Sequence, residues 1–170
     1  MPILIAIVVL LGAAVAGAGA AVYGQAPECP SQPGDARSTQ SIGDILGASG
    51  RMIVNDGEAT TIARGYVGDR VNEARVCFTP GAGHLSGKLP LGSVAPSFYA
   101  SAGVDLSGPT PRTTNLEVKV GALPNLPGVS DQVARIVSDL INQSLEGWRL
   151  DQPYAADFAT GSVTVTKLGQ

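Results

Sequence analysis

The fold is decided by one stretch of the sequence, VSDQVARIVSDLINQSLEGW at residues 129–148. Its apolar residues recur at the spacing of one helical face. They are Val133, Ile136, Val137, Leu140, Ile141 and Leu145. Ser130 is a suitable N-cap, and Gly147 is a plausible terminator. The stretch therefore predicts a long amphipathic helix, whose wide apolar arc must be wrapped by other elements.

Most of the chain around this helix alternates between apolar and polar residues, as strands with one buried and one wet face do. Four such runs precede the helix and two follow it, the last two flanking the turn Thr160-Gly161. The runs are 74–79, 84–91, 97–106, 115–120, 154–159 and 162–167. A short helix over 58–67, capped by Asn55 or Asp56, comes before them.

These elements predict an α+β fold. A curved antiparallel sheet of about six strands wraps around one long amphipathic helix, with a short N-terminal helix and a preceding transmembrane segment. The expected boundaries are a membrane segment at 1–24, a tether rich in Pro, Gly and Ser at 25–50, and an extracytoplasmic domain at 51–170. Within the tether, Ile42, Ile45 and Leu46 could form a short ordered turn.

The N-terminal segment is apolar without interruption from Ile3 to Val22, and no charged side chain occurs before Glu28. About 20 such residues suffice to span a bilayer. An uncleaved signal anchor and a cleaved signal peptide, with Ala18-Gly19-Ala20 as the cleavage candidate, both fit this run. The expected location is the cell membrane, single-pass, with the C-terminal domain outside the cytoplasm, or secreted if the segment is cleaved.

Composition narrows the class of protein. The chain has 170 residues, a net charge of −3, 44% hydrophobic and 15% charged residues, enough for one domain with a real core. The acidic balance and the scattered Lys and Arg residues provide no basic surface for a nucleic acid.

Few residues could carry chemistry. His84 is the single histidine, falls on the wet parity of its strand and has no partner at a fixed spacing, so it is interpreted as a surface histidine. With two cysteines and one histidine, a zinc site made of Cys and His ligands is not available. Cys29 and Cys77 favour a disulfide in an exported chain, with two free thiols as the alternative. We therefore expect no enzyme, no metal and no cofactor.

The residues predicted to face inward from the sheet say more about a possible ligand site. Among them, small residues such as Ala100 and Ala102 alternate with larger ones. These small residues could let the helix pack closely over a dry core. They could instead leave an apolar groove between sheet and helix that accepts an acyl chain. The expected groove residues are Phe98, Val104, Leu116, Val118, Val137, Leu140, Ile141 and Leu145.

The order of several segments along the chain can be compared with that of a known family. They are the helix at 58–67, the strands ARVCF at 74–78 and HLSGK at 84–88, the segment VKVGALP at 118–124 that leads into the helix at 133–145, and the hairpin strand GSVTV at 161–165. From about Ala59 to Gly169 this order resembles the bacterial LmeA-like phospholipid-binding proteins, a half-module related to tubular lipid-binding (TULIP) domains. The resemblance implies a sheet around a long helix, an apolar cavity, and lipid binding at the cell envelope, with no catalytic residues.

We therefore expect a membrane-anchored, extracytoplasmic domain that binds a lipid or another long apolar ligand between sheet and helix. Its partners would be the membrane, through the N-terminal segment, and the ligand. Burial of each ligand methylene would contribute about 0.8 kcal/mol. The alternative is a structural or interaction module of the cell envelope, in which the core is filled and no ligand binds.

Overall fold

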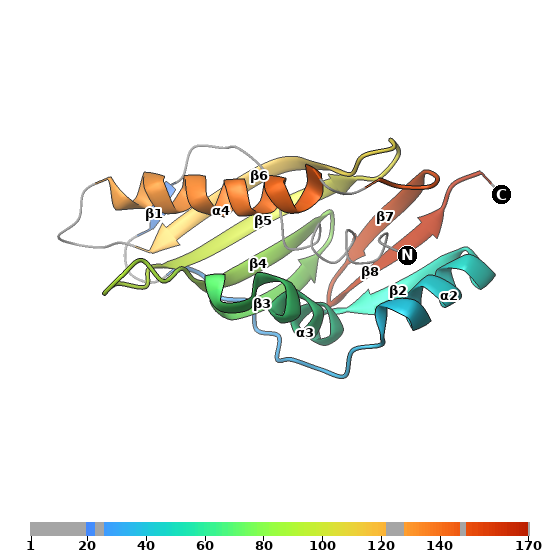
Figure 1. The fold of residues 1–170 in the computed structure, drawn as a ribbon, viewed down its shortest axis with the longest axis horizontal. Helices are drawn as coiled ribbons and strands as arrows, with labels where there is room; N and C mark the ends of the chain where they lie inside the picture. Colours follow the sequence, from blue (N-terminus) through green and yellow to red (C-terminus); the bar gives the residue numbers. More distant parts are fainter. Residues whose placement is uncertain (1–19, 23–25, 122–127, 147–148, 170) are drawn as a thin grey trace.

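Two sheets and three helices make up the described part of the chain, residues 20–22, 26–121, 128–146 and 149–169 of a computed structural model (Figure 1). The helices are α2 (Thr39–Ser49), α3 (Asp56–Val67) and α4 (Val129–Glu146), and a 3-10 turn at Gly68–Arg70 follows α3. The strands are β1 (Ala20–Val22), β2 (Arg51–Asn55), β3 (Asn72–Thr79), β4 (Ala82–Lys88), β5 (Ser97–Asp105), β6 (Arg112–Gly121), β7 (Tyr154–Ala159) and β8 (Ser162–Lys167).

The larger sheet has the strand order β1-β6-β5-β4-β3. Strands β3 to β6 are consecutive in sequence and pair antiparallel, so they form a meander. Leu85 pairs with both Val76 and Ala100, and Ala100 pairs with Val118. These four side chains share one face of the sheet, as the alternation of apolar residues predicts.

The smaller sheet has the order β2-β8-β7 and is antiparallel throughout. Strands β7 and β8 form the predicted hairpin, and Gly161 occupies its turn with a φ of 78°. A positive φ of this kind favours glycine, because an L side chain would be strained there. The hairpin meets the larger sheet where Gly161 N donates to Phe78 O at 3.1 Å.

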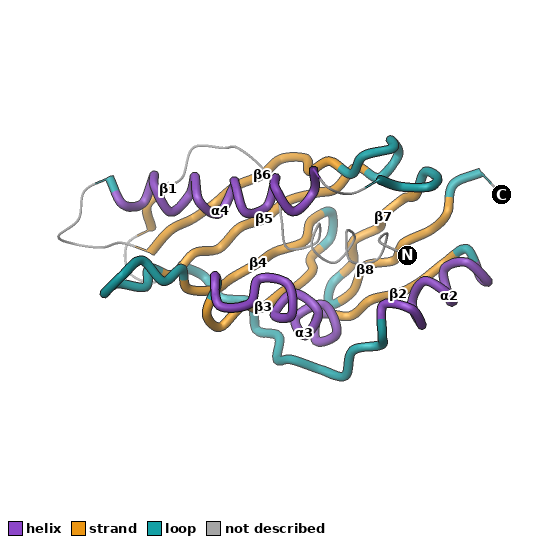
Figure 2. Tube along the Cα trace, viewed as in Figure 1, coloured by secondary structure: helices purple, strands orange, loops and turns teal. Residues whose placement is uncertain are grey.

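Capping residues mark the first turns of α2 and α3. Ser38 caps α2 by accepting the N–H of Ser41 at 3.1 Å, and Gly50 ends that helix in the left-handed conformation. Asn55 caps α3 by accepting the N–H of Glu58 at 2.9 Å. In Figure 2 the helices lie apart from one another, α4 along β6, α3 against β3 and α2 beside β2.

One hydrophobic core joins both sheets to all three helices. Its largest fully buried side chains are Phe98, Ile42, Leu106, Val54, Val76, Val118 and Val120. Ile42 and Leu46 enter this core from α2, at the place where the sequence suggested only a short ordered turn inside a tether. The folded structure therefore includes residues that the sequence analysis assigned to the segment before the domain.

The predicted fold class is wrong in its architecture, although the protein is α+β. We expected one curved sheet wrapped around one long amphipathic helix, whereas the described strands form two sheets and three separate helices cover them. The physical reason is the pairing of β2 with β8, which are more than a hundred residues apart in the chain. Alternation reveals which face of a strand is buried but not which strand lies beside it.

The predicted single-pass membrane anchor, and with it the cell-membrane location, is also corrected. Residues 1–19 lie outside the described part of the chain. Ala20–Val22, which end the apolar run, form strand β1 and pair in parallel with Lys119–Gly121 of β6. Among the residues described, no helix is long and apolar enough to cross a membrane. An apolar run can supply a buried strand as well as a helix, and hydropathy does not separate the two.

Candidate functional site

The residues expected to line an apolar groove lie in the core between α4 and the larger sheet. Five of them are almost completely buried, with exposed fractions of 1–4%. These are Phe98, Leu116, Val118, Val137 and Ile141. Val104 and Leu140 are half-buried and pack against the same core. The side chain of Leu145 lies outside the described residues.

The small residues of the larger sheet are covered as well. Ala100 and Ala102 on β5 have exposed fractions of 2% and 7%, and both belong to the same core. Both side chains are therefore covered by their neighbours in the core. The structure does hold a surface cleft elsewhere, next to β4, and its lining is polar and charged: Glu28, Glu73, Arg75, Ser86, Gly87 and Lys88.

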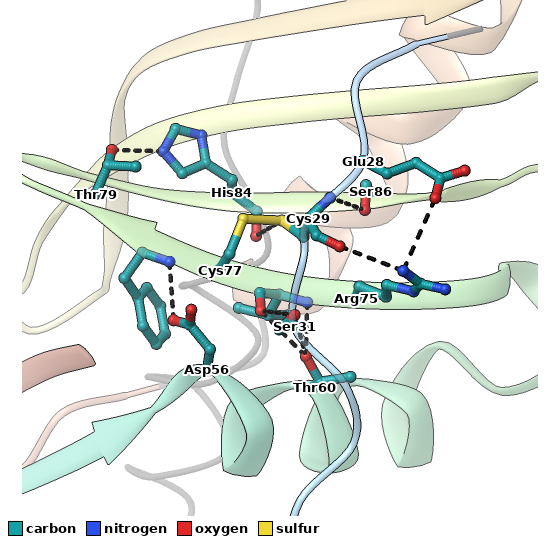
Figure 3. The surroundings of a disulfide bond; sticks show 12 residues. Glu28, Cys29, Ser31, Asp56, Thr60, Arg75, Cys77, Thr79, His84 and Ser86 are labelled. Carbon is teal, nitrogen blue, oxygen red and sulfur yellow. Dashed lines mark hydrogen bonds and ion pairs between the residues drawn. A yellow bond between two sulfur atoms is a disulfide. The ribbon is translucent and has the colours of Figure 1, made fainter. Parts of the chain in front are cut away.

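A segment before α2 crosses the opposite face of the larger sheet, and we call residues 26–37 the strap. Its first part lies over three strands in turn (Figure 3). Ala26 N donates to Ser97 Oγ of β5 and Cys29 N donates to Ser86 Oγ of β4, both at 2.9 Å. A disulfide then joins Cys29 to Cys77 of β3.

The disulfide pairs the two cysteines as the sequence favoured, with a Cα–Cα distance of 5.5 Å. Cys29 is fully buried and Cys77 is 7% exposed, so the bond lies beneath the surface. It closes a chain separation of 48 residues. By the chain-entropy estimate, a loop of that length contributes about 3–4 kcal/mol to stability. The strap is therefore a structural brace of the sheet.

Beyond the disulfide, the strap passes the edge of β3 and reaches α3. Ser31 Oγ donates to Val76 O at 2.6 Å and lies 3.1 Å from Thr60 Oγ1. Gly34 N donates to Gly57 O at 3.0 Å. The strap thus ties α3 to the larger sheet through contacts with both.

Arg37 and Glu58 complete this attachment with a charged contact that the sequence analysis missed. The two side chains form an ion pair at 2.7 Å, in which the Glu58 side chain is 3% exposed. The hydrogen bond that Arg37 donates to the Glu58 carboxylate raises the pKa of Arg37. The sequence does place Glu58 in the first turn of a capped helix. No local pattern, however, indicates that Arg37, 21 residues upstream, contacts it.

His84 is buried, so its interpretation as a surface histidine is wrong. His84 does lie on the face of β4 that was predicted to contact solvent, but its exposed fraction is only 9%. Its ring stacks on Tyr99 with the centroids 5.3 Å apart. Figure 3 shows the ring pointing toward Thr79, whose Oγ1 lies 2.7 Å from Nε2. Burial, and secondarily the charge of Lys119, lower the pKa of His84.

Within the described residues, the second ring nitrogen of His84 has no group that orients it. A histidine that activates a hydroxyl is normally oriented by an acceptor at its second ring nitrogen. The Nδ1 atom of His84 is buried and has no hydrogen-bond partner in the described part of the chain. Within the same residues, no group of three or more His, Cys, Asp or Glu side chains could hold a metal ion. Thr79 and His84 thus form a hydrogen bond that links β3 to β4.

No family model matches the chain, and no curated protein matches its sequence. The resemblance to LmeA-like phospholipid-binding proteins accordingly stays a prediction.

Proposed function

We propose that this chain is a disulfide-braced structural or interaction module with a filled core, without catalytic activity of its own. The observation that carries the proposal is the burial of Phe98, Leu116, Val118, Val137 and Ile141, which were expected to line a groove. Side chains that pack against one another at native density leave no room for an acyl chain.

The strap supports a role that depends on rigidity. It fixes three strands and α3 by one covalent bond and several hydrogen bonds, and two of the acceptor residues, Ser86 and Val76, are at most 1% exposed. Such bracing holds surfaces in fixed positions, which lowers the entropy that a partner must overcome on binding. A carrier that opens for a long ligand would instead need an element free to move.

The non-catalytic part of the proposal rests on His84. It is the single histidine of the chain, and no described residue partners its buried Nδ1. A general base also needs access to the proton that it removes. An exposed fraction of 9% gives a substrate little access to this ring.

The test is organic extraction of the purified full chain, followed by mass spectrometry of the extract. A filled core predicts no lipid at a stoichiometric amount. An Ile141→Ala variant is the matched control, because it removes a side chain that is 4% exposed and creates an apolar cavity. Recovery of about one lipid per unmodified chain would overturn the proposal.

A further inference from the structure

The outer face of the smaller sheet is open to solvent. Strands β2, β8 and β7 pair in three rows across this face. The rows are Arg51–Thr166–Ala155, Ile53–Thr164–Asp157 and Asn55–Ser162–Ala159. The members on β2 and β7 are exposed, and those on the central strand β8 are half-buried. We call these nine residues the small-sheet face.

One large apolar side chain, that of Ile53, is exposed in the middle of this face. The large hydrophobic residues that are exposed in the described chain are Ile53 at 52%, Leu168 at 42% and Tyr66 at 40%. Ile53 stands in the middle row of the small-sheet face, and Leu168 comes directly after β8. Most other members have short side chains, so the surface is flat.

The small-sheet face is held rigidly from behind. Met52, Val54, Val163 and Val165 alternate with its members along β2 and β8, and all four are at most 2% exposed. They belong to the core that includes α2 and the larger sheet. The face is therefore a preformed surface, and binding to it orders few additional groups.

Two opposite charges stand at opposite edges of the face. Arg51 lies on β2 and Asp157 lies on β7, with the central strand β8 between them. Within the described residues, neither side chain takes part in an ion pair. This surface has a positive charge on one side of its midline and a negative charge on the other. It is therefore complementary to a copy of itself rotated by a two-fold axis.

We propose that the small-sheet face is the interface of a symmetric dimer of this chain. The two-fold axis lies between the two faces and runs parallel to β8. It places β2 of one protomer opposite β7 of its partner. Arg51 then faces the row of Ala155, about 7 Å along the strand from Asp157, within the reach of an arginine side chain. Symmetry forms this ion pair twice, on either side of Thr164 at the axis.

The size of the face sets the strength of the dimer. Three strands about 4.8 Å apart and rows about 7 Å apart span only a few hundred Å² on each protomer. Stable interfaces bury about 800 Å² on each side. The dimer is therefore weak and dissociates on dilution. This inference deepens the proposed function, on which it rests, because it names a second copy as the partner of the interaction module.

Sedimentation velocity of the full chain, from about 10 µM to about 1 mM at low ionic strength, tests the dimer. The unmodified chain should shift from monomer to dimer across this range. Arg51→Asp and Asp157→Arg should each weaken association by at least about tenfold, because each places like charges opposite one another. The double variant, with both charges exchanged, should restore the association. Ile53→Lys should abolish it by a different route.

Asp139→Arg is the matched control, since it reverses an exposed acid on α4 that lies outside the face, and it should leave association unchanged. Circular dichroism would establish that each variant is folded. A chain that stays monomeric up to about 1 mM overturns the inference. The inference is also overturned if the single substitutions leave the association unchanged, or if the double variant stays monomeric. None of these results bears on core filling, which the extraction experiment tests separately.

Discussion

Arg37 and Glu58 form a bidentate ion pair that fastens the end of the strap to the first turn of α3. Arg37 Nε donates to Glu58 Oε1 and Arg37 Nη2 donates to Oε2, both at 2.7 Å. The backbone N–H of Arg37 also donates to Oε1, at 3.1 Å. The same guanidinium reaches Ile53 O of β2 at 2.6 Å. One residue of the strap therefore joins α3 to the smaller sheet.

Removing the cation from this pair should destabilise the fold. Arg37→Met keeps the aliphatic stem but leaves the Glu58 carboxylate buried and unpaired. We expect a loss of about 2–3 kcal/mol in the free energy of unfolding, measured by urea denaturation. This is less than for a fully buried pair, because the Arg37 side chain is 36% exposed. Adding Glu58→Gln should recover part of the loss, and an unchanged Arg37→Met variant would contradict this role.

The disulfide should be a major source of stability. Replacing Cys29 and Cys77 together by serine removes the constraint on the unfolded chain and should cost about 3–4 kcal/mol. The strap should then become the first site of limited proteolysis, because the covalent bond that ties it to β3 is lost. If the serine variant unfolds at the same urea concentration as the parent, the brace is not structural.

The burial of His84 predicts an acid-sensitive fold. Its pKa in the folded protein is below the ordinary value of 6.5. As the pH falls below 6.5, the unfolded chain takes up this proton before the folded chain does, so stability decreases until the folded-state pKa is passed. Denaturation at pH 7 and pH 5 measures the difference.

His84→Gln is the control for this pH effect and should remove most of the change between pH 7 and pH 5. The carboxylates with lowered pKa values, Glu73 and Asp105, titrate at more acidic pH and contribute little in this window. Burial raises the pKa of Asp56, which acts in the opposite direction by favouring the folded state in acid. An equal decrease with and without His84 would rule out the assignment.

Substitution by alanine should change the stability of the fold in opposite directions at two glycines. A Cβ at Gly87 of β4 would stand 2.5 Å from Val71 Cγ1 and 3.1 Å from Asn72 O, so Gly87→Ala should cost about 1–3 kcal/mol. A Cβ at Gly65 of α3 meets nothing within 4 Å. Gly65→Ala should therefore stabilise the helix by about 0.5–1 kcal/mol. Thermal melts of the two variants separate these effects, and a shared sign would contradict the packing described for β4.

The sequence predicts the parts of this fold that local patterns determine. Alternation locates β3 to β8, and the helical period locates a helix at Val129–Glu146. It does not predict that β2 joins β8, because pairing between distant strands leaves no local pattern. Ala20–Val22 were misassigned for a related reason, since an apolar run satisfies both a membrane span and a sheet edge.

The candidate site is predictable only in part. The even cysteine count indicates the pairing of Cys29 with Cys77, and the inward parity identifies the residues of the core. The burial of His84 cannot be read from parity, because parity shows which face a residue lies on and not what covers that face. Whether Phe98 and Ile141 line a groove or fill a core depends on distances between elements, which periodicity does not contain.

Titration of the full chain with an apolar fluorescent probe tests the filled core most directly. We predict no saturable binding to the unmodified chain at neutral pH. The Ile141→Ala variant, which opens a cavity beneath α4, should gain binding of a small apolar molecule such as benzene. Saturable binding of about one probe per unmodified chain, competed by a fatty acid, would contradict the account and favour an apolar-ligand carrier.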